Sequence, residues 1–269
     1  MGRVIGPPIH EREKAWLLKQ HVFFTGSAPL SAKNRVNVSP KSAKEFRVVD
    51  EKTVCWLDYT GSGSETAAHI MENGRLTIMF VSFEGPPKII RFHGMGRLIT
   101  PSDAMLIENK PISDLFEGEL IGQRNYSCGF RCIIVMDVNR VSQSCGFSIP
   151  EFTYTRDRKT LREFTEEKGT EKIKEYRGLK NSFSIDGLKS VGQLETGRIP
   201  TSVNLEGGYY FAQYGERNFM GEMMVCAMMS WRNGKLHAFL YTVAVFLSGV
   251  IAGIFSVAAV SRPSSMQEL

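Results

Sequence analysis

Residues 36–99 constrain the fold of this chain more than any other stretch. Two strand-like runs, residues 46–50 (FRVVD) and 53–59 (TVCWLDY), lead into a turn of small and hydroxyl residues, 60–66 (TGSGSET). A helix is predicted over residues 65–73, and two further strands follow, ending in residues 93–97 (HGMGR). β-Branched and aromatic runs bounded by Gly and Asn are typical of strands. We therefore expect a small β-barrel that carries a phosphate-binding loop.

The turn at residues 60–66 has the chemistry of an anion site. Its two glycines and four hydroxyl side chains leave backbone N–H groups free to point at a phosphate, and the start of a helix adds favourable potential. The alternative is ordinary helix capping by Ser64 or Thr66, because Ser and Thr satisfy the orphan N–H groups at any helix start. Both interpretations stay open on the sequence alone.

The segments around this turn resemble the pyridoxamine 5′-phosphate oxidase-like, flavin-binding split-barrel family. The resemblance covers about residues 9–190, and the order of its motifs along the chain is more specific than any one of them. It rests on residues 34–41 (NRVNVSPK), the strand end 56–60 (WLDYT), the passage 72–80 (ENGRLTIMF), residues 141–147 (VSQSCGF), the helix at 161–176 and residues 180–188 (KNSFSIDGL).

The resemblance implies a mainly β fold, an FMN-binding split barrel with flanking helices, and a homodimer. It implies FMN as the cofactor, with a deazaflavin or a haem-type ligand as the alternative occupant. The residues that it assigns to the flavin are Arg35 and Lys41 for phosphate or ring contacts, Asp58, Tyr59 and Thr60 at the strand end, and Ser64 and Thr66 at the phosphate. It assigns no catalytic residue and no metal ligand.

The sequence departs from true pyridoxamine phosphate oxidases at two places. Basic residues stand in their phosphate loop where this chain has Ser64, Glu65 and Thr66, and a carboxylate beside a phosphate is unfavourable unless it turns away. Their C-terminal Arg-x-His pair is also missing, since the triplet 91–93 (RFH) lies mid-chain. Vitamin B6 oxidation is therefore not the expected reaction. His69 and His93 are candidate proton donors, although a lone histidine is more often a packing residue.

Composition excludes few classes of protein. The net charge of +5 comes from 33 basic and 28 acidic residues that are interspersed, as in residues 156–159 (RDRK), so we interpret it as a solvated mixed surface and expect no nucleic-acid partner. The five cysteines include no Cys-x-x-Cys pair, which predicts reduced thiols in the cytosol.

Residues 238–260 predict a transmembrane helix. These 23 residues carry no charge, and at about 1.5 Å per residue they make a rod of roughly 34 Å, enough to cross a bilayer core. Only residues 261–269 follow and no apolar leader precedes, so we expect a single-pass tail anchor with the main domain in the cytosol. Gly249 and Gly253 form a Gly-x-x-x-Gly pair that allows two membrane helices to approach closely.

These patterns divide the chain into a split-barrel domain (1–192), a juxtamembrane linker (193–237) with a short amphipathic helix at 219–231, the membrane helix (238–260) and a short tail (261–269). Further helices are expected at 9–20 and at 112–121, and residues 101–103 are expected to start another short helix. Further strands are expected at 22–25, 88–99 and 129–141. The predicted function is that of a membrane-tethered FMN-dependent oxidoreductase of unknown substrate. The alternative is a non-catalytic flavin- or haem-binding membrane-anchored module.

Overall fold

The computed structural model describes residues 2–116, 129–197, 202–204 and 211–213. Its contacts divide the chain into two compact units. The first holds all described residues up to 197, and the second holds a two-stranded antiparallel hairpin, β9 (Ser202–Asn204) with β10 (Phe211–Gln213).

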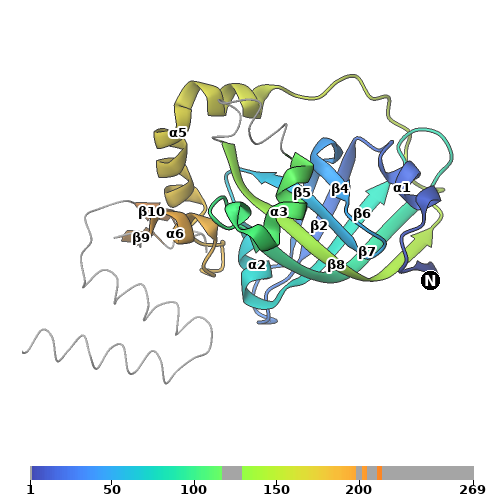
Figure 1. The fold of residues 1–269 in the computed structure, drawn as a ribbon, viewed down its shortest axis with the longest axis horizontal. Helices are drawn as coiled ribbons and strands as arrows, with labels where there is room; N and C mark the ends of the chain where they lie inside the picture. The colour runs from blue at the N-terminus through green and yellow to red at the C-terminus, as the bar shows by residue number, and fades with distance from the viewer. Residues whose placement is uncertain (1, 117–128, 198–201, 205–210, 214–269) are drawn as a thin grey trace, which may run out of the picture. The chain divides into compact units, whose positions relative to one another are not determined.

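An eight-stranded sheet, antiparallel throughout, makes up the first unit (Figure 1). Its strands pair in the order β3-β2-β6-β7-β8-β5-β4, and β1 also pairs with β8. The strands are β1 (Arg3–Gly6), β2 (Val22–Ser27), β3 (Asn37–Ser42), β4 (Phe46–Val48), β5 (Thr53–Tyr59), β6 (Arg75–Val81), β7 (Ile89–Ile99) and β8 (Phe130–Ser144).

The sheet curls so far that its two edges come together. β3 and β4 stand at opposite ends of the strand order, yet only the single 3₁₀ turn η1 (Ala43–Glu45) separates them in the chain. The rings of Phe23 on β2 and Phe46 on β4 also meet, with centroids 5.2 Å apart. The expected mainly β, barrel-like fold is confirmed, and the line where β3 faces β4 and β5 is called the seam below.

Apolar side chains fill both faces of the central strand β8. Ile134 and Met136 pack inside the curl with the rings of Phe23, Phe46, Phe80 and Trp56. Ile133 and Val135 point the other way, where Ile112 and Phe116 cover them. Burial on both faces explains the near-continuous apolar run of this strand, which the sequence predicted for residues 129–141.

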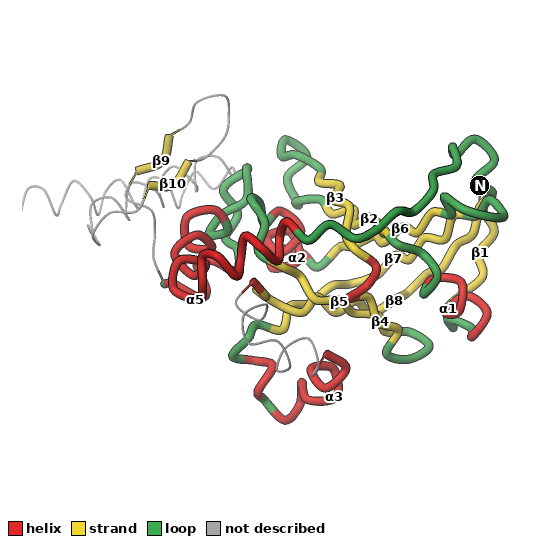
Figure 2. Tube along the Cα trace, turned by 90° about the horizontal axis from the view of Figure 1, so that it is seen from above, coloured by secondary structure: helices red, strands yellow, loops and turns green. Residues whose placement is uncertain are grey.

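Helices lie around the sheet (Figure 2). They are α1 (Glu11–Leu17), α2 (Glu65–Asn73), α3 (Lys110–Ser113), α5 (Thr160–Lys180) and α6 (Val191–Thr196), with 3₁₀ turns η2 (Asp103–Met105), η3 (Ile107–Asn109) and η4 (Asp114–Phe116). The predicted bounds of α2 are confirmed, and Gly74 is its left-handed C-cap. Ser64 stands at the N-cap position, but its side chain makes no capping hydrogen bond and donates to the Asn181 carbonyl oxygen instead. The helix expected at 112–121 begins earlier, at Lys110, and its part beyond Phe116 lies outside the described residues.

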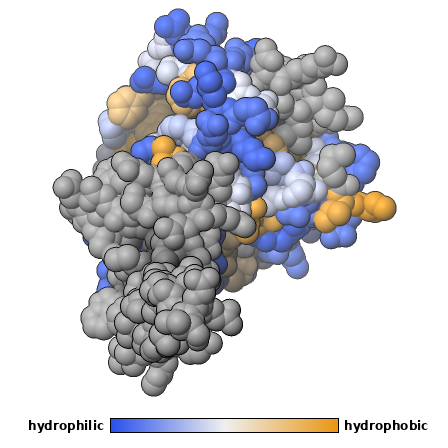
Figure 3. Space-filling view, turned by 90° about the vertical axis from the view of Figure 1, so that its left-hand side faces the viewer, coloured by the Kyte–Doolittle hydropathy of each residue, from blue (hydrophilic) through white to orange (hydrophobic). Residues whose placement is uncertain are grey.

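The amphipathic helix expected at 161–176 is present as α5, but Gly169 interrupts it with a positive φ of 71°. Ile173 and Arg177 are buried, whereas most other side chains of the helix are exposed. Figure 3 views the molecule from the side on which α5 lies, and hydrophilic side chains predominate over the described surface there.

No helix in the described residues is long and apolar enough to cross a membrane. The predicted membrane helix at 238–260, the Gly249 and Gly253 pair and the amphipathic helix at 219–231 all lie outside those residues.

Gly94→Ala is expected to destabilise the fold. Gly94 sits where the register between β7 and β8 shifts, and a Cβ there would lie 2.0 Å from the carbonyl oxygen of Asp137, so the two strands must move apart. We expect a loss of about 1–3 kcal/mol in the free energy of unfolding, measured with urea. Gly26→Ala on β2 is the matched control, because its Cβ would meet only ordinary contacts at 3.8 Å. Equal stability of the two variants would contradict this prediction.

Candidate functional site

A groove of about 1020 Å³ lies at the seam of the barrel. One wall is formed by β3 and η1, and the second by the end of β5. The third wall is the segment that leads into α5 and the first turn of that helix. The lining residues are Pro40, Lys41, Ser42, Lys44, Glu45, Leu57, Asp58, Tyr59, Thr60, Gly61, Arg156, Asp157, Arg158, Lys159, Leu161 and Arg162.

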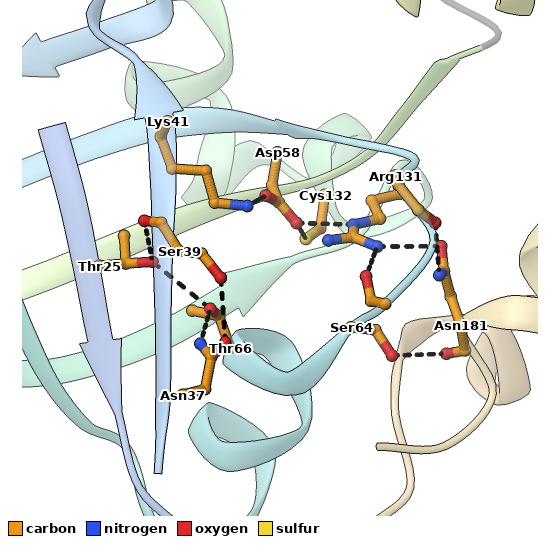
Figure 4. Close-up of polar contacts among 12 residues, drawn as sticks. Thr25, Asn37, Ser39, Lys41, Asp58, Ser64, Thr66, Arg131, Cys132 and Asn181 are labelled. Carbon is orange, nitrogen blue, oxygen red and sulfur yellow. Dashed lines mark hydrogen bonds and ion pairs between the residues drawn. The ribbon is translucent and has the colours of Figure 1, made fainter. Parts of the chain in front are cut away.

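A buried carboxylate holds the groove walls together (Figure 4). Asp58 on β5 accepts from Lys41 Nζ on β3 at 2.9 Å and from Arg131 Nε on β8 at 2.6 Å. The Lys41 contact crosses the seam, so it exists only because the sheet curls. Arg131 is only 5% exposed and also donates to the carbonyl oxygen of Gly63 and to Asn181 Oδ1.

The electrostatics of this cluster leave a surplus positive charge facing the groove. Burial raises the pKa of the Asp58 carboxyl, but Arg131 and Lys41 outweigh it and bring that pKa down to about 2. Asp58 is therefore ionised near neutral pH. Burial and the Asp58 charge raise the pKa of the neighbouring Cys132 thiol, so it stays protonated. Two cations thus share one carboxylate, and Lys41, the more exposed of the two, lines the groove.

The turn at residues 60–66 contacts residues 181–190 of the same chain. Asn181 Nδ2 donates to the carbonyl oxygen of Gly61 at 2.9 Å, and Ser190 Oγ donates to that of Ser64 at 3.2 Å. Ser64 Oγ in turn donates to the backbone oxygen of Asn181. The Glu65 carboxylate turns toward the same segment and accepts from the Ile185 N–H at 3.3 Å. The turn therefore serves as a junction between α2 and residues 181–190.

Thr66 belongs to a separate hydrogen-bond group beneath α2. Its hydroxyl accepts from Asn37 Nδ2 at 3.0 Å and lies 3.5 Å from that of Thr25. One turn later, His69 Nδ1 contacts Ser27 Oγ at 2.9 Å, and burial lowers the pKa of this histidine. Thr66 and His69 are both buried and face the sheet.

Four of the seven residues assigned to the flavin by resemblance line the groove together: Lys41, Asp58, Tyr59 and Thr60. Ser64 and Thr66 are buried in the contacts just described. Arg35 pairs with Asp186, through its guanidinium at 2.6 Å and its backbone N–H at 2.7 Å. His93 lies on β7 with its Nδ1 3.2 Å from the Thr77 hydroxyl, and neither His69 nor His93 lines the groove. Contact of any of these residues with a flavin stays a prediction.

Sequence reasoning missed two contributors to the site. Arg131 stands in an otherwise apolar run, and a charge in such a run signals a buried partner, although nothing local names Asp58. Arg156, Arg158 and Lys159 were interpreted as a solvated surface. They are exposed, but they also form a wall of the groove, so that interpretation was incomplete.

Comparison with known proteins identifies the family. No protein-family profile matches the chain. A curated relative, the pyridoxamine 5′-phosphate oxidase family protein ustO of Aspergillus flavus, is 34% identical over 193 residues, which cover 64% of this chain and 72% of the relative. The chain belongs to the pyridoxamine 5′-phosphate oxidase family.

Solved structures give weaker likenesses. Group A Streptococcus HupZ is 20% identical with a TM-score of 0.37, and covers 49% of this chain and 91% of its own. A pyridoxamine 5′-phosphate oxidase-related, FMN-binding protein of Nostoc punctiforme is 12% identical with a TM-score of 0.34, and covers 54% and 87%. The family assignment rests on the fungal relative.

Asp58→Asn is expected to destabilise the protein by about 3–5 kcal/mol at pH 7, because it leaves the buried Arg131 without its counter-charge. The free energy of unfolding of this variant should also fall less steeply at acid pH than that of the wild type. The carboxyl pKa is about 2 in the folded protein and about 3.9 unfolded, so the wild type loses this stabilisation as the pH falls from about 5 to 2.

The measurement is urea unfolding across that pH range. Asp137→Asn, which changes an exposed carboxylate on β8, is the control and should behave as the wild type does. A variant at position 58 that matches the wild type in both stability and acid dependence would show that the cluster does not stabilise the fold.

Proposed function

We propose that the seam groove binds flavin mononucleotide and that the protein is a flavin-dependent oxidoreductase. Family membership supports this proposal, and one observation carries it. Asp58, backed by Arg131, fixes a lysine ammonium at the wall of a groove of about 1020 Å³, the upper end of the range for small-molecule sites. Such a fixed cation suits an anionic group of the flavin.

The residues present fit this cofactor. Lys41 and Lys44, on the wall formed by β3 and η1, offer ammonium groups to a phosphate. Tyr59 and Thr60 lie across the groove, at the end of β5. Asp58 positions Lys41 and is itself almost fully buried. Arg177 braces the same wall from α5, since its guanidinium lies 3.4 Å from the Thr60 hydroxyl and pairs with Glu195. A bound flavin supplies hydride or single-electron transfer, so the chain itself needs only to place it and to shape the site around it.

A second candidate function is a non-catalytic module that binds a flavin or a haem-like ligand. The observation that favours it is the turn at 60–66, whose carbonyl oxygens bond residues 181–190 and whose Glu65 carboxylate lies beside them. In that case the turn holds residues 181–190 in place and makes no contact with the cofactor. Reduction of bound flavin by NADH or NADPH distinguishes the candidates, because only the oxidoreductase needs it.

The proposal also includes, on the sequence alone, a membrane anchor at residues 238–260 and pairing of two chains. Carbonate extraction of membranes from expressing cells tests the first, and light scattering of the detergent-solubilised chain tests the second. Extraction of the chain into the soluble fraction would remove the anchor from the proposal.

The full chain, purified in detergent, is expected to show the visible absorbance of a flavin. Lys41→Ala should weaken flavin binding at least about tenfold, because a charge-assisted hydrogen bond contributes about 1.5–3 kcal/mol. Lys172→Ala, on an exposed position of α5, is the control and should keep the wild-type affinity. A colourless protein that also fails to bind added FMN would overturn the flavin assignment.

A further inference from the structure

The segment between β8 and α5 lies along the barrel as a strap, defined here as residues 150–159. In Figures 1 and 2 it runs the length of the sheet from the β1 end to α5. The Phe152 N–H donates to the carbonyl oxygen of Phe83 at 3.0 Å, and the Tyr154 N–H donates to Glu84 Oε1 at 2.7 Å. Every strap residue is exposed, so packing into the core does not explain its course.

Three hollows lie in a row between the strap and the barrel. The first is the seam groove. The second, of about 430 Å³, shares Lys44 and Asp157 with it. The third, of about 770 Å³, shares Gln20 and His21 with the second. Because neighbouring hollows share wall residues, the three adjoin one another along the strap, and together they are called the trough below.

The two ends of this trough differ in chemistry. At the seam end, Arg158 and Lys159 make no ion pair with a described carboxylate within 4 Å, although Glu45 and Asp157 line the same groove. At the far end five of the wall residues carry rings, Trp16, His21, Phe83, Phe152 and Tyr154, and they stand beside the charged Lys19, Glu84 and Arg156. The rings of His21 and Tyr154 stack with centroids 3.6 Å apart, and those of Phe83 and Phe152 meet edge to face at 5.3 Å.

We infer that the trough binds a second small molecule, one with an anionic head and an aromatic tail. The cations at the seam end match a carboxylate, sulfonate or phosphate head, and the aromatic walls match a planar tail. Walls on both sides favour an elongated small molecule over a folded macromolecule. If the seam groove also holds a flavin, the head of this molecule lies beside it, and the molecule is then the substrate. Only this last statement rests on the proposed flavin function.

The test uses naphthalene-1-sulfonate as the probe, with methanesulfonate as the head alone and 1-naphthol as the neutral tail. Binding to the full chain in detergent is measured by calorimetry against a blank of the same detergent. We expect naphthalene-1-sulfonate to bind at least about tenfold more tightly than either fragment, since each end adds interactions that the other cannot replace.

Two double variants address the two ends. Arg158→Gln with Lys159→Gln removes strap cations, and Phe152→Ala with Tyr154→Ala removes strap rings; each is expected to weaken the probe about tenfold. All four positions are exposed, so the fold should tolerate the changes, and a thermal melt checks this. The matched controls are Lys172→Gln with Lys174→Gln on α5, and Phe147→Ala, an exposed ring that lines none of the three hollows.

Loss of binding in both double variants and in neither control supports the inference. An effect of the cation variant alone would mean a simple anion site, and an effect of the ring variant alone would mean an apolar site; either result overturns the two-ended trough. Unchanged affinity in both variants overturns it as well. Flavin absorbance of the same samples separates the two proposals, because a colourless protein that binds the probe in the expected pattern fails only the flavin function.

Discussion

The three-residue connection between β3 and β4 is the constraint on which the rest of the structure depends. β3 and β4 are the strands at the two opposite edges of the sheet, and a link of three residues forces these edges to meet. The curl encloses the aromatic core and creates the seam. It also brings Lys41 from one edge within 2.9 Å of Asp58, next to the other edge. The closure of the barrel therefore also forms the groove.

The Asp58 cluster connects this seam to the C-terminal part of the barrel unit. Arg131 bonds Asp58 and Asn181 at once, and Asn181 bonds the turn that follows β5. A buried ion pair of this kind adds little net stability over an apolar substitute, but removing one partner is costly. The cluster thus fixes the position of one lysine ammonium more firmly than a surface pair would, which is what an anion site requires.

The sequence predicted those parts of the fold that depend on local pattern. Strand-forming runs and the helix at 65–73 were found because β-branched and aromatic runs and the Gly- and hydroxyl-rich turn before the helix are local signals. The contacts of Asp58 with Arg131, and of Gly61 with Asn181, join residues 73 and 120 positions apart, and no local signal reports them. The curl of the sheet determines which of the predicted residues line the groove together. Ser64 and Thr66 were grouped with Lys41 by the family resemblance alone.

The break in α5 separates two parts of the helix that make different contacts. Gly169, with its positive φ, divides the helix into a first half that continues the strap and a second half that Arg177 ties to Thr60 and Glu195. A non-glycine residue is strained in that conformation, so the joint depends on this one position. The kink therefore sets the direction of the first half of α5, and with it the strap wall of the groove, apart from the half that holds Thr60 on the opposite wall.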